Sequence, residues 1–261
     1  DWIMTIKDKS IGAAFCDAAA VIGGNAKLGI VCAMDVEMQG LLDAMRGVSV
    51  EEIYGFKFYE GVLEHTKVVL VRCGIGKVKA AIGATMMIEK HHPDVIISSG
   101  CAGGADPSLN VGDVVVAAET TYHDAYCGDN CAYGQIMGMP KRYILSDKLN
   151  VIVQQFGADC STISMGLTVS GDWFVDTREK MCEIMQHFPE AKAVDMESCS
   201  IAQVCHTFDV PFVSFRIISD VPLKDHKAAM YFDFWDRLAD GSFEVTNRFV
   251  ELLQQQNEAL Q

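Results

Sequence analysis

Residues 27–45, KLGIVCAMDVEMQGLLDAM, join a continuous apolar run to an amphipathic segment. The run at 27–34 is typical of a strand buried on both faces. In the segment that follows, Met38, Leu41, Leu42 and Met45 recur at helical spacing. The switch of period predicts a strand followed directly by a helix, and the rest of the chain repeats this unit.

The same alternation continues to the C-terminus. FKFYEGVLE and KVVLVRC predict a hairpin around His65 and Thr66. KVKAAIGATMMIEK, at 77–90, predicts a helix, and VIISSG the strand after it. The expected core-facing stripe of this helix consists of Val78, Ala81, Ile82, Thr85 and Met86. Further strands are expected at 111–119, 162–171, 191–196 and 210–220, helices at 147–156, 177–188, 198–208 and 242–255, and a Gly-, Tyr- and Met-rich loop at 122–143.

The absence of a linker, repeat or low-complexity tract predicts one α/β domain over 27–261, with a mixed central β-sheet flanked by helices. Residues 1–26 form an N-terminal extension. It is interpreted as a peripheral helix, with a remnant export signal or added sequence as the alternatives. In sheets of this kind ligands bind beyond the carboxyl ends of the strands, so the site is expected there.

Charge and hydropathy exclude several classes of partner. The chain has 35 acidic and 21 basic residues, a formal charge of −14, and no cluster of Lys or Arg. Nucleic-acid binding is therefore not expected, because it depends on neutralising phosphates. No run reaches the roughly 18 apolar residues of a membrane span. These features favour a small neutral or cationic ligand and a cytoplasmic location, with export through the N-terminal extension left open.

The ten cysteines are scattered and lie mostly in apolar segments, as expected of buried reduced thiols. Cys127 and Cys131 form the only close pair and are interpreted either as a loop disulfide or as one corner of a metal site. A second ligand pair is missing, so no metal and no cofactor is predicted.

Most motifs with known chemistry are absent. CGIGKV, at 73–78, has the spacing of neither a phosphate loop nor a dinucleotide fingerprint, and it predicts a tight turn. VSGDWF, at 169–174, is not a nucleophile elbow. What remains are carboxylates at strand ends: Glu37, Glu197 and Asp220. Each alone could cap a helix, but three at one edge of a sheet predict a shared site.

Seven segments resemble the 5′-methylthioadenosine/S-adenosylhomocysteine nucleosidases of the nucleoside phosphorylase superfamily, in family order over roughly 27–255. They are LGIVCAMDVEMQGLL, CGIGKVKAAIGAT, PDVIISSGCAGG, VGDVVVAAETTYHDA, VSGDWFV, AVDMESCSIAQVCHTFDVPF and FRIISD. The resemblance implies a nucleoside phosphorylase-like fold, a homodimer, and hydrolysis of the bond between adenine and a 5′-thio-substituted ribose.

The resemblance also implies roles for the carboxylates. Asp220 matches the general acid that protonates adenine N7, with Ser219 orienting it. Glu37 matches the base that activates water on the opposite face of the sugar. Arg216 matches an arginine that orders this region.

Other matching residues bind the nucleoside. Glu197 corresponds to the clamp on the ribose hydroxyls, and Met196 lies against the sugar. Phe174 corresponds to the ring that stacks on adenine, and the backbone of Val175 reads the edge of the base. Ala102 and Gly103 are expected along the base and ribose. The 5′ subsite is expected to be apolar and completed by a second subunit, with Tyr133, Ile136, Met137, Met230 and Phe232 as uncommitted candidates.

The chain departs from the family pattern at three positions. The turn after Met34 reads DVE where relatives carry a run of glutamates, although Glu37 is kept. Asp195 stands where Glu is usual, and Cys101 where a water-binding serine is common. Three alternatives therefore stay open: phosphorolysis by a purine nucleoside phosphorylase, a futalosine-type hydrolase, and a non-catalytic nucleoside-binding or storage protein.

Overall fold

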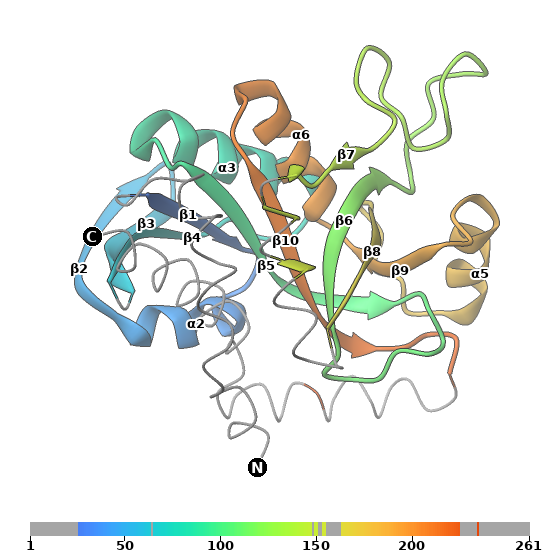
Figure 1. Cartoon of the computed structure of the whole chain (residues 1–261), viewed down its shortest axis with the longest axis horizontal. Helices are drawn as coiled ribbons and strands as arrows, with labels where there is room; N and C mark the ends of the chain where they lie inside the picture. Colours follow the sequence, from blue (N-terminus) through green and yellow to red (C-terminus); the bar gives the residue numbers. More distant parts are fainter. Residues whose placement is uncertain are drawn as a thin grey trace.

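The computed structural model describes residues 26–63, 65–147, 149–150, 153–154, 163–224 and 234. Within these ranges it shows the expected α/β fold, a ten-stranded mixed sheet with helices on both faces (Figure 1). Several predicted features lie outside the described residues: the extension up to residue 25, the helix at 242–255, most of the helix at 147–156, and the candidates Met230 and Phe232.

The described elements follow one another in the order predicted, with two additional strands, β2 and the two-residue β7. They are β1 (Lys27–Cys32), α2 (Asp35–Ala44), β2 (Met45–Ile53), β3 (Phe56–Leu63), β4 (Thr66–Arg72), α3 (Lys77–His91), β5 (Val95–Gly104), β6 (Val114–Tyr122), β7 (Tyr143–Ile144), β8 (Ile163–Ser170), α5 (Arg178–His187), β9 (Ala191–Asp195), α6 (Ser198–Phe208) and β10 (Phe212–Asp220).

The sheet has an open part and a closed part. β1 lies between β4 and β5 and runs parallel to both, and the β3–β4 hairpin and β2 extend this part outward. β5 also pairs with β9 and β10, and β10 continues through β6 and β8 back to β9. These five strands close into a ring. Because β1, β4, β5 and β10 are parallel, their carboxyl ends meet at one edge, which positions the candidate site.

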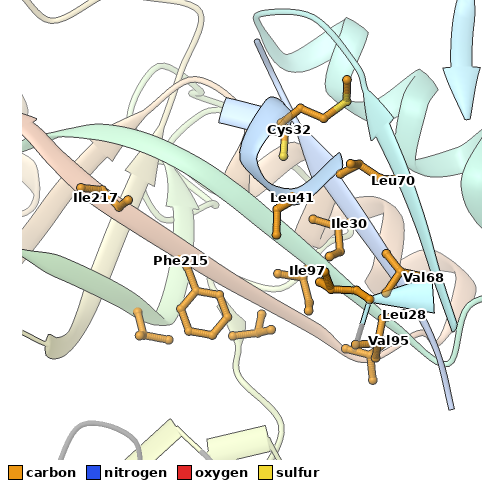
Figure 2. Packing of buried hydrophobic residues seen from close by; sticks show 14 of the residues in the cluster. Leu28, Ile30, Cys32, Leu41, Val68, Leu70, Val95, Ile97, Phe215 and Ile217 are labelled. Carbon is orange, nitrogen blue, oxygen red and sulfur yellow. The ribbon is translucent and has the colours of Figure 1, made fainter. Parts of the chain in front are cut away.

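The core lies on both faces of the sheet because successive strand residues point to opposite sides. Leu28 and Ile30 of β1 pack with Leu41 of α2 on one face (Figure 2). Val31, the residue after Ile30, packs on the other face, where α3 and α6 supply Met87 and Ile201. This alternation explains why the strands read as continuous apolar runs.

The structure corrects the predicted face of α3. Val78 is 69% exposed and Ile82 is 42% exposed, whereas the buried residues of the helix are Ala80, Gly83, Ala84, Met87, Ile88 and His91. The small residues decide the orientation because they let the helix lie close to the sheet. A Cβ on Gly83 would lie 2.8 Å from the Cβ of Cys73.

Two boundaries also differ from prediction. Met45, expected at the end of the first helix, instead begins β2, which the sequence analysis did not predict. Most of β2 is exposed, so it lacks the apolar signal of a buried strand. β5 continues past Gly100 to Gly104, so the glycine-rich segment around Cys101 is strand rather than loop.

Candidate active site

A pocket of about 410 Å³ opens at the edge where the parallel strands end. Glu37 enters it from the first turn of α2, Glu197 from the residue before α6, and Asp220 from the last position of β10. All three carboxylates are buried, and they come from segments far apart in the chain. The pocket is lined by Ala33, Met34, Glu37, Ile75, Cys101, Ala102, Gly103, Trp173, Phe174, Val175, Val194, Asp195, Met196, Glu197, Ser219 and Asp220.

The structure therefore brings ten of the eleven predicted site residues to one pocket. Arg216 is the exception, since it does not line this pocket. It lines an adjoining cavity of about 10 Å³ together with Glu37, Cys101 and Glu197. A space of this size suits one water molecule, and its polar walls offer hydrogen-bond partners for it.

Glu37 is held by three backbone N–H groups. Its Oε2 accepts hydrogen bonds from Ala33 and Met34, each at 3.0 Å, and its Oε1 accepts one from Cys101 at 3.0 Å. The close approach to β5 depends on Gly100, where a Cβ would lie 3.0 Å from Oε1. Burial raises the pKa of Glu37, against the opposing effects of the Arg216 charge and these three hydrogen bonds. A carboxylate with a raised pKa is a stronger base than one in water.

Glu197 lies opposite the N-terminus of α3. Its Oε1 accepts a hydrogen bond from Gly76 N–H at 2.9 Å, and Gly76 has a φ of 92°, a conformation that favours glycine. Burial, followed by the negative charge of Asp195, raises the pKa of Glu197 to about 7. The predicted tight turn at CGIGKV is present, and it also contacts the site through Gly76 and Ile75.

Asp220 is oriented by its neighbour. Ser219 Oγ lies 2.7 Å from Asp220 Oδ1, to which it donates a hydrogen bond, and 3.3 Å from the carbonyl oxygen of Ala102. Asp220 Oδ2 is on the side of Gly103, where a Cβ would lie 3.9 Å away. Ser219 therefore fixes the orientation of the Asp220 carboxyl group at the wall of the pocket.

The other walls of the pocket are mainly apolar. Phe174 and Trp173 are 58% and 53% exposed, whereas Val175 is buried beneath them. Trp173 and Ile75 were missed by the sequence analysis, although each lies within a segment that it singled out. Nothing in a single sequence separates a pocket-lining Trp or Ile from a core residue, because both are apolar.

Cys101 lies at the bottom of this site as a thiol. Burial, followed by the charge of Glu37, raises its pKa well above the ordinary value. The raised pKa favours the protonated thiol, which is a poor nucleophile. Cys127 and Cys131 are also free thiols. Among the described residues, no three His, Cys, Asp or Glu side chains are placed to hold a metal ion. None of the described helices has the length and apolar character of a membrane-spanning segment.

Comparisons with known proteins identify the family to which the chain belongs. A profile described as "Phosphorylase superfamily" matches residues 27–251. A 5′-methylthioadenosine/S-adenosylhomocysteine nucleosidase from Neisseria meningitidis, solved with methylthio-immucillin-A, is 34% identical with a TM-score of 0.80, and the match covers 86% of this chain and 98% of that one.

Two further solved structures are similar. An S-adenosylhomocysteine nucleosidase from Streptococcus pyogenes, solved with 5-methylthiotubericidin, is 30% identical with a TM-score of 0.82, and the match covers 88% of this chain and 98% of that one. A futalosine hydrolase from Helicobacter pylori is 27% identical with a TM-score of 0.77 and coverages of 88% and 97%. The chain thus belongs to the phosphorylase superfamily, and 5′-methylthioadenosine/S-adenosylhomocysteine nucleosidases are among its solved relatives.

Proposed function

We propose that the protein hydrolyses the N-glycosidic bond of 5′-methylthioadenosine and S-adenosylhomocysteine, with 5′-deoxyadenosine as a further substrate. Water adds across the bond between ribose C1′ and adenine N9, which yields adenine and the 5-substituted ribose. The observation that carries this proposal is the meeting of Glu37, Glu197 and Asp220 around one pocket with an exposed aromatic wall. The nucleosidase relatives with bound nucleoside analogues support it.

Each carboxylate has a step that its surroundings suit. Asp220 gives a proton to adenine N7, which makes adenine a better leaving group, while Ser219 holds the other carboxylate oxygen. Glu37 takes a proton from a water molecule held in the cavity of about 10 Å³, and the oxygen of this water molecule attacks C1′. Glu197 accepts hydrogen bonds from the ribose hydroxyls, and its negative charge stabilises the cation that develops on the sugar. Phe174 stacks on adenine and Met196 lies against the ribose.

The charges around the pocket favour water over phosphate as the nucleophile. Its described lining includes four acids and no Lys, Arg or His. Arg216 is paired with Asp195, and Arg72, the extra cation considered for a phosphate cradle, is paired with Asp35 at the surface. A phosphate dianion would therefore meet uncompensated negative charge, so phosphorolysis is disfavoured.

A futalosine-type nucleoside is the second candidate substrate, because the Helicobacter pylori futalosine hydrolase has nearly the same fold. The three carboxylates of the pocket would serve the hydrolysis of either nucleoside, because both reactions break an N-glycosidic bond to ribose. Among the described residues, no contact distinguishes a futalosine-type nucleoside from a 5′-thio-substituted adenosine. Assays with both classes of nucleoside distinguish these two candidate substrates.

Exposed apolar residues beside the pocket support the homodimer. Val78 and Ile82 on the outer face of α3 continue from Ile75, which itself lines the pocket and is 56% exposed. A second copy of the chain that covers this face would bury apolar area and narrow the pocket mouth. In sedimentation equilibrium, Val78→Lys is therefore expected to lower the molecular mass from that of a dimer toward that of a monomer. A variant with the same mass as the unaltered protein would show that this face is not the dimer interface.

The proposal is tested by release of the free purine base, with and without phosphate. The panel is methylthioadenosine, adenosylhomocysteine and 5′-deoxyadenosine, which release adenine, together with a futalosine-type nucleoside and inosine, which releases hypoxanthine. We expect the thio-substituted adenosines to be hydrolysed at equal rates in both conditions. Release only with phosphate would show a phosphorylase, and binding without release at high protein concentration would show a storage or binding protein.

A further inference from the structure

The carboxylate of Asp195, the last residue of β9, is buried and fully hydrogen bonded. Arg216 Nε donates to its Oδ2 at 2.7 Å, and the two side chains are 1% and 3% exposed. The Ser170 hydroxyl donates to Oδ1, and the hydroxyl and N–H of Ser198 also donate to the carboxylate. Ser170 is itself fixed by the N–H of Cys199 at 2.9 Å. The position of Asp195 is therefore determined by three different elements.

This carboxylate in turn fixes Arg216. The guanidinium also donates to Ser98 Oγ at 2.8 Å and to the carbonyl oxygen of Phe215 at 3.0 Å. It lines the small cavity together with Glu37 and Glu197. Among the hydrogen bonds of the described residues, none joins the guanidinium to either glutamate.

Three carboxylates thus surround one buried cation, and full ionisation of Asp195, Glu37 and Glu197 would leave two uncompensated negative charges. Asp220 lines the same pocket and also faces them. The remaining titratable or charged groups are the thiols of Cys32, Cys73, Cys101 and Cys199, the imidazole of His123, and the ion pair of Lys77 with Asp124. Burial raises the pKa of each thiol and lowers that of His123, so these groups are neutral near pH 7. Glu37 and Glu197, whose pKa values are raised, therefore change charge closer to neutral pH than an exposed glutamate does.

We propose that Asp195 is a positioning residue for the hydrolysis proposed above: it holds Arg216 beside the water cavity, so that the guanidinium faces both glutamates without bonding to either. The inference rests on the proposed function. It deepens that function by explaining how a buried glutamate keeps enough affinity for a proton to act as a base. The raised pKa of Glu37 and the value of about 7 for Glu197 agree with it.

The test is Asp195→Asn, which keeps the shape of the side chain and removes its charge. The unpaired guanidinium is then attracted to the glutamates and stabilises their ionised forms. We expect the acid limb of kcat/KM for methylthioadenosine to move to lower pH by about one unit, and kcat to fall about 10-fold or more with a smaller change in KM. Asp195→Glu keeps the charge and is expected to keep the position of the limb. Asp209→Asn, at the exposed C-cap of α6, is the control for loss of one negative charge.

A second measurement requires no substrate. Infrared titration of the unaltered protein should show a buried protonated carboxyl that is lost near pH 7, and in Asp195→Asn this loss should occur at lower pH. Loss only near pH 4.5 in the unaltered protein, or an unmoved limb in a folded Asp195→Asn variant, would overturn the proposal. Failure of the unaltered protein to release adenine would instead count against the proposed hydrolysis, because the carboxyl titration does not depend on turnover.

Discussion

Replacing Gly100 with alanine tests whether Glu37 must lie directly against β5. A Cβ at this position would lie 3.0 Å from Oε1, 3.3 Å from Cδ and 3.4 Å from Oε2 of Glu37. The carboxylate would have to move by a few tenths of an ångström. This movement would take it away from the Cys101 N–H, from which it now accepts a hydrogen bond at 3.0 Å. A hydrogen bond to a charged group contributes about 1.5–3 kcal/mol. If this bond is needed to orient the base, its loss lowers kcat by about 10- to 100-fold.

The assay is steady-state adenine release from methylthioadenosine, with kcat and KM determined separately and the fold checked by urea unfolding. The matched control is Gly40→Ala in α2, the helix that carries Glu37. A Cβ at Gly40 meets no atom within 4 Å. Gly40→Ala is expected to keep kcat and to raise the free energy of unfolding by about 1 kcal/mol, because alanine favours helix. A Gly100→Ala variant with kcat within about twofold of the unaltered protein would refute the argument for the position of Glu37.

Three other predictions concern the carboxylates and the thiol. Asp220→Asn should lower kcat by about 100- to 10,000-fold, the usual range for a general acid, while calorimetry still detects nucleoside binding. Cys101→Ser should keep or raise adenine release, and loss of activity would reopen a nucleophilic role for the thiol. Because the folded state raises the pKa of Glu197 from 4.5 to about 7, this group stabilises the fold below pH 4.5 and loses that contribution as pH rises through 7. Glu197→Gln should therefore remove about 3 kcal/mol of the decline in unfolding free energy between pH 4.5 and 8, and an unchanged pH dependence would contradict the raised pKa.

The alternation of strands and helices could be read from the sequence because the buried strands are continuous apolar runs. The three carboxylates could be located for the same reason, since each directly follows a strong strand signal. The meeting of Glu37 and Asp220 at one edge then follows from the parallel direction of β1, β5 and β10. Glu197 follows β9, which pairs antiparallel with the end of β5, so its arrival at the same edge could not be inferred in this way. The closure of five strands into a ring could not be read, because pairing of β5 with both β9 and β10 leaves no local pattern.

The orientation of α3 was mispredicted because the apolar stripe and the close-packing stripe are different faces. Ala80, Gly83 and Ala84 face the sheet, where space is short, and the larger Val78 and Ile82 face outward. Summed hydrophobicity favours burial of the face with Val78 and Ile82, whereas steric fit favours burial of the face with Ala80, Gly83 and Ala84. The network around Asp195 was equally hidden, because Ser170, Ser198 and Arg216 approach it from separate parts of the chain.

The central claim is that buried carboxylates on this scaffold activate water to release adenine from a 5′-thio-substituted adenosine. It is tested most directly by incubating the protein with methylthioadenosine in phosphate-free buffer and measuring adenine beside the Asp220→Asn variant. The account predicts release by the unaltered protein, unaffected by added phosphate, and little or none by the variant. Equal release by both proteins, or release that requires phosphate, would contradict it.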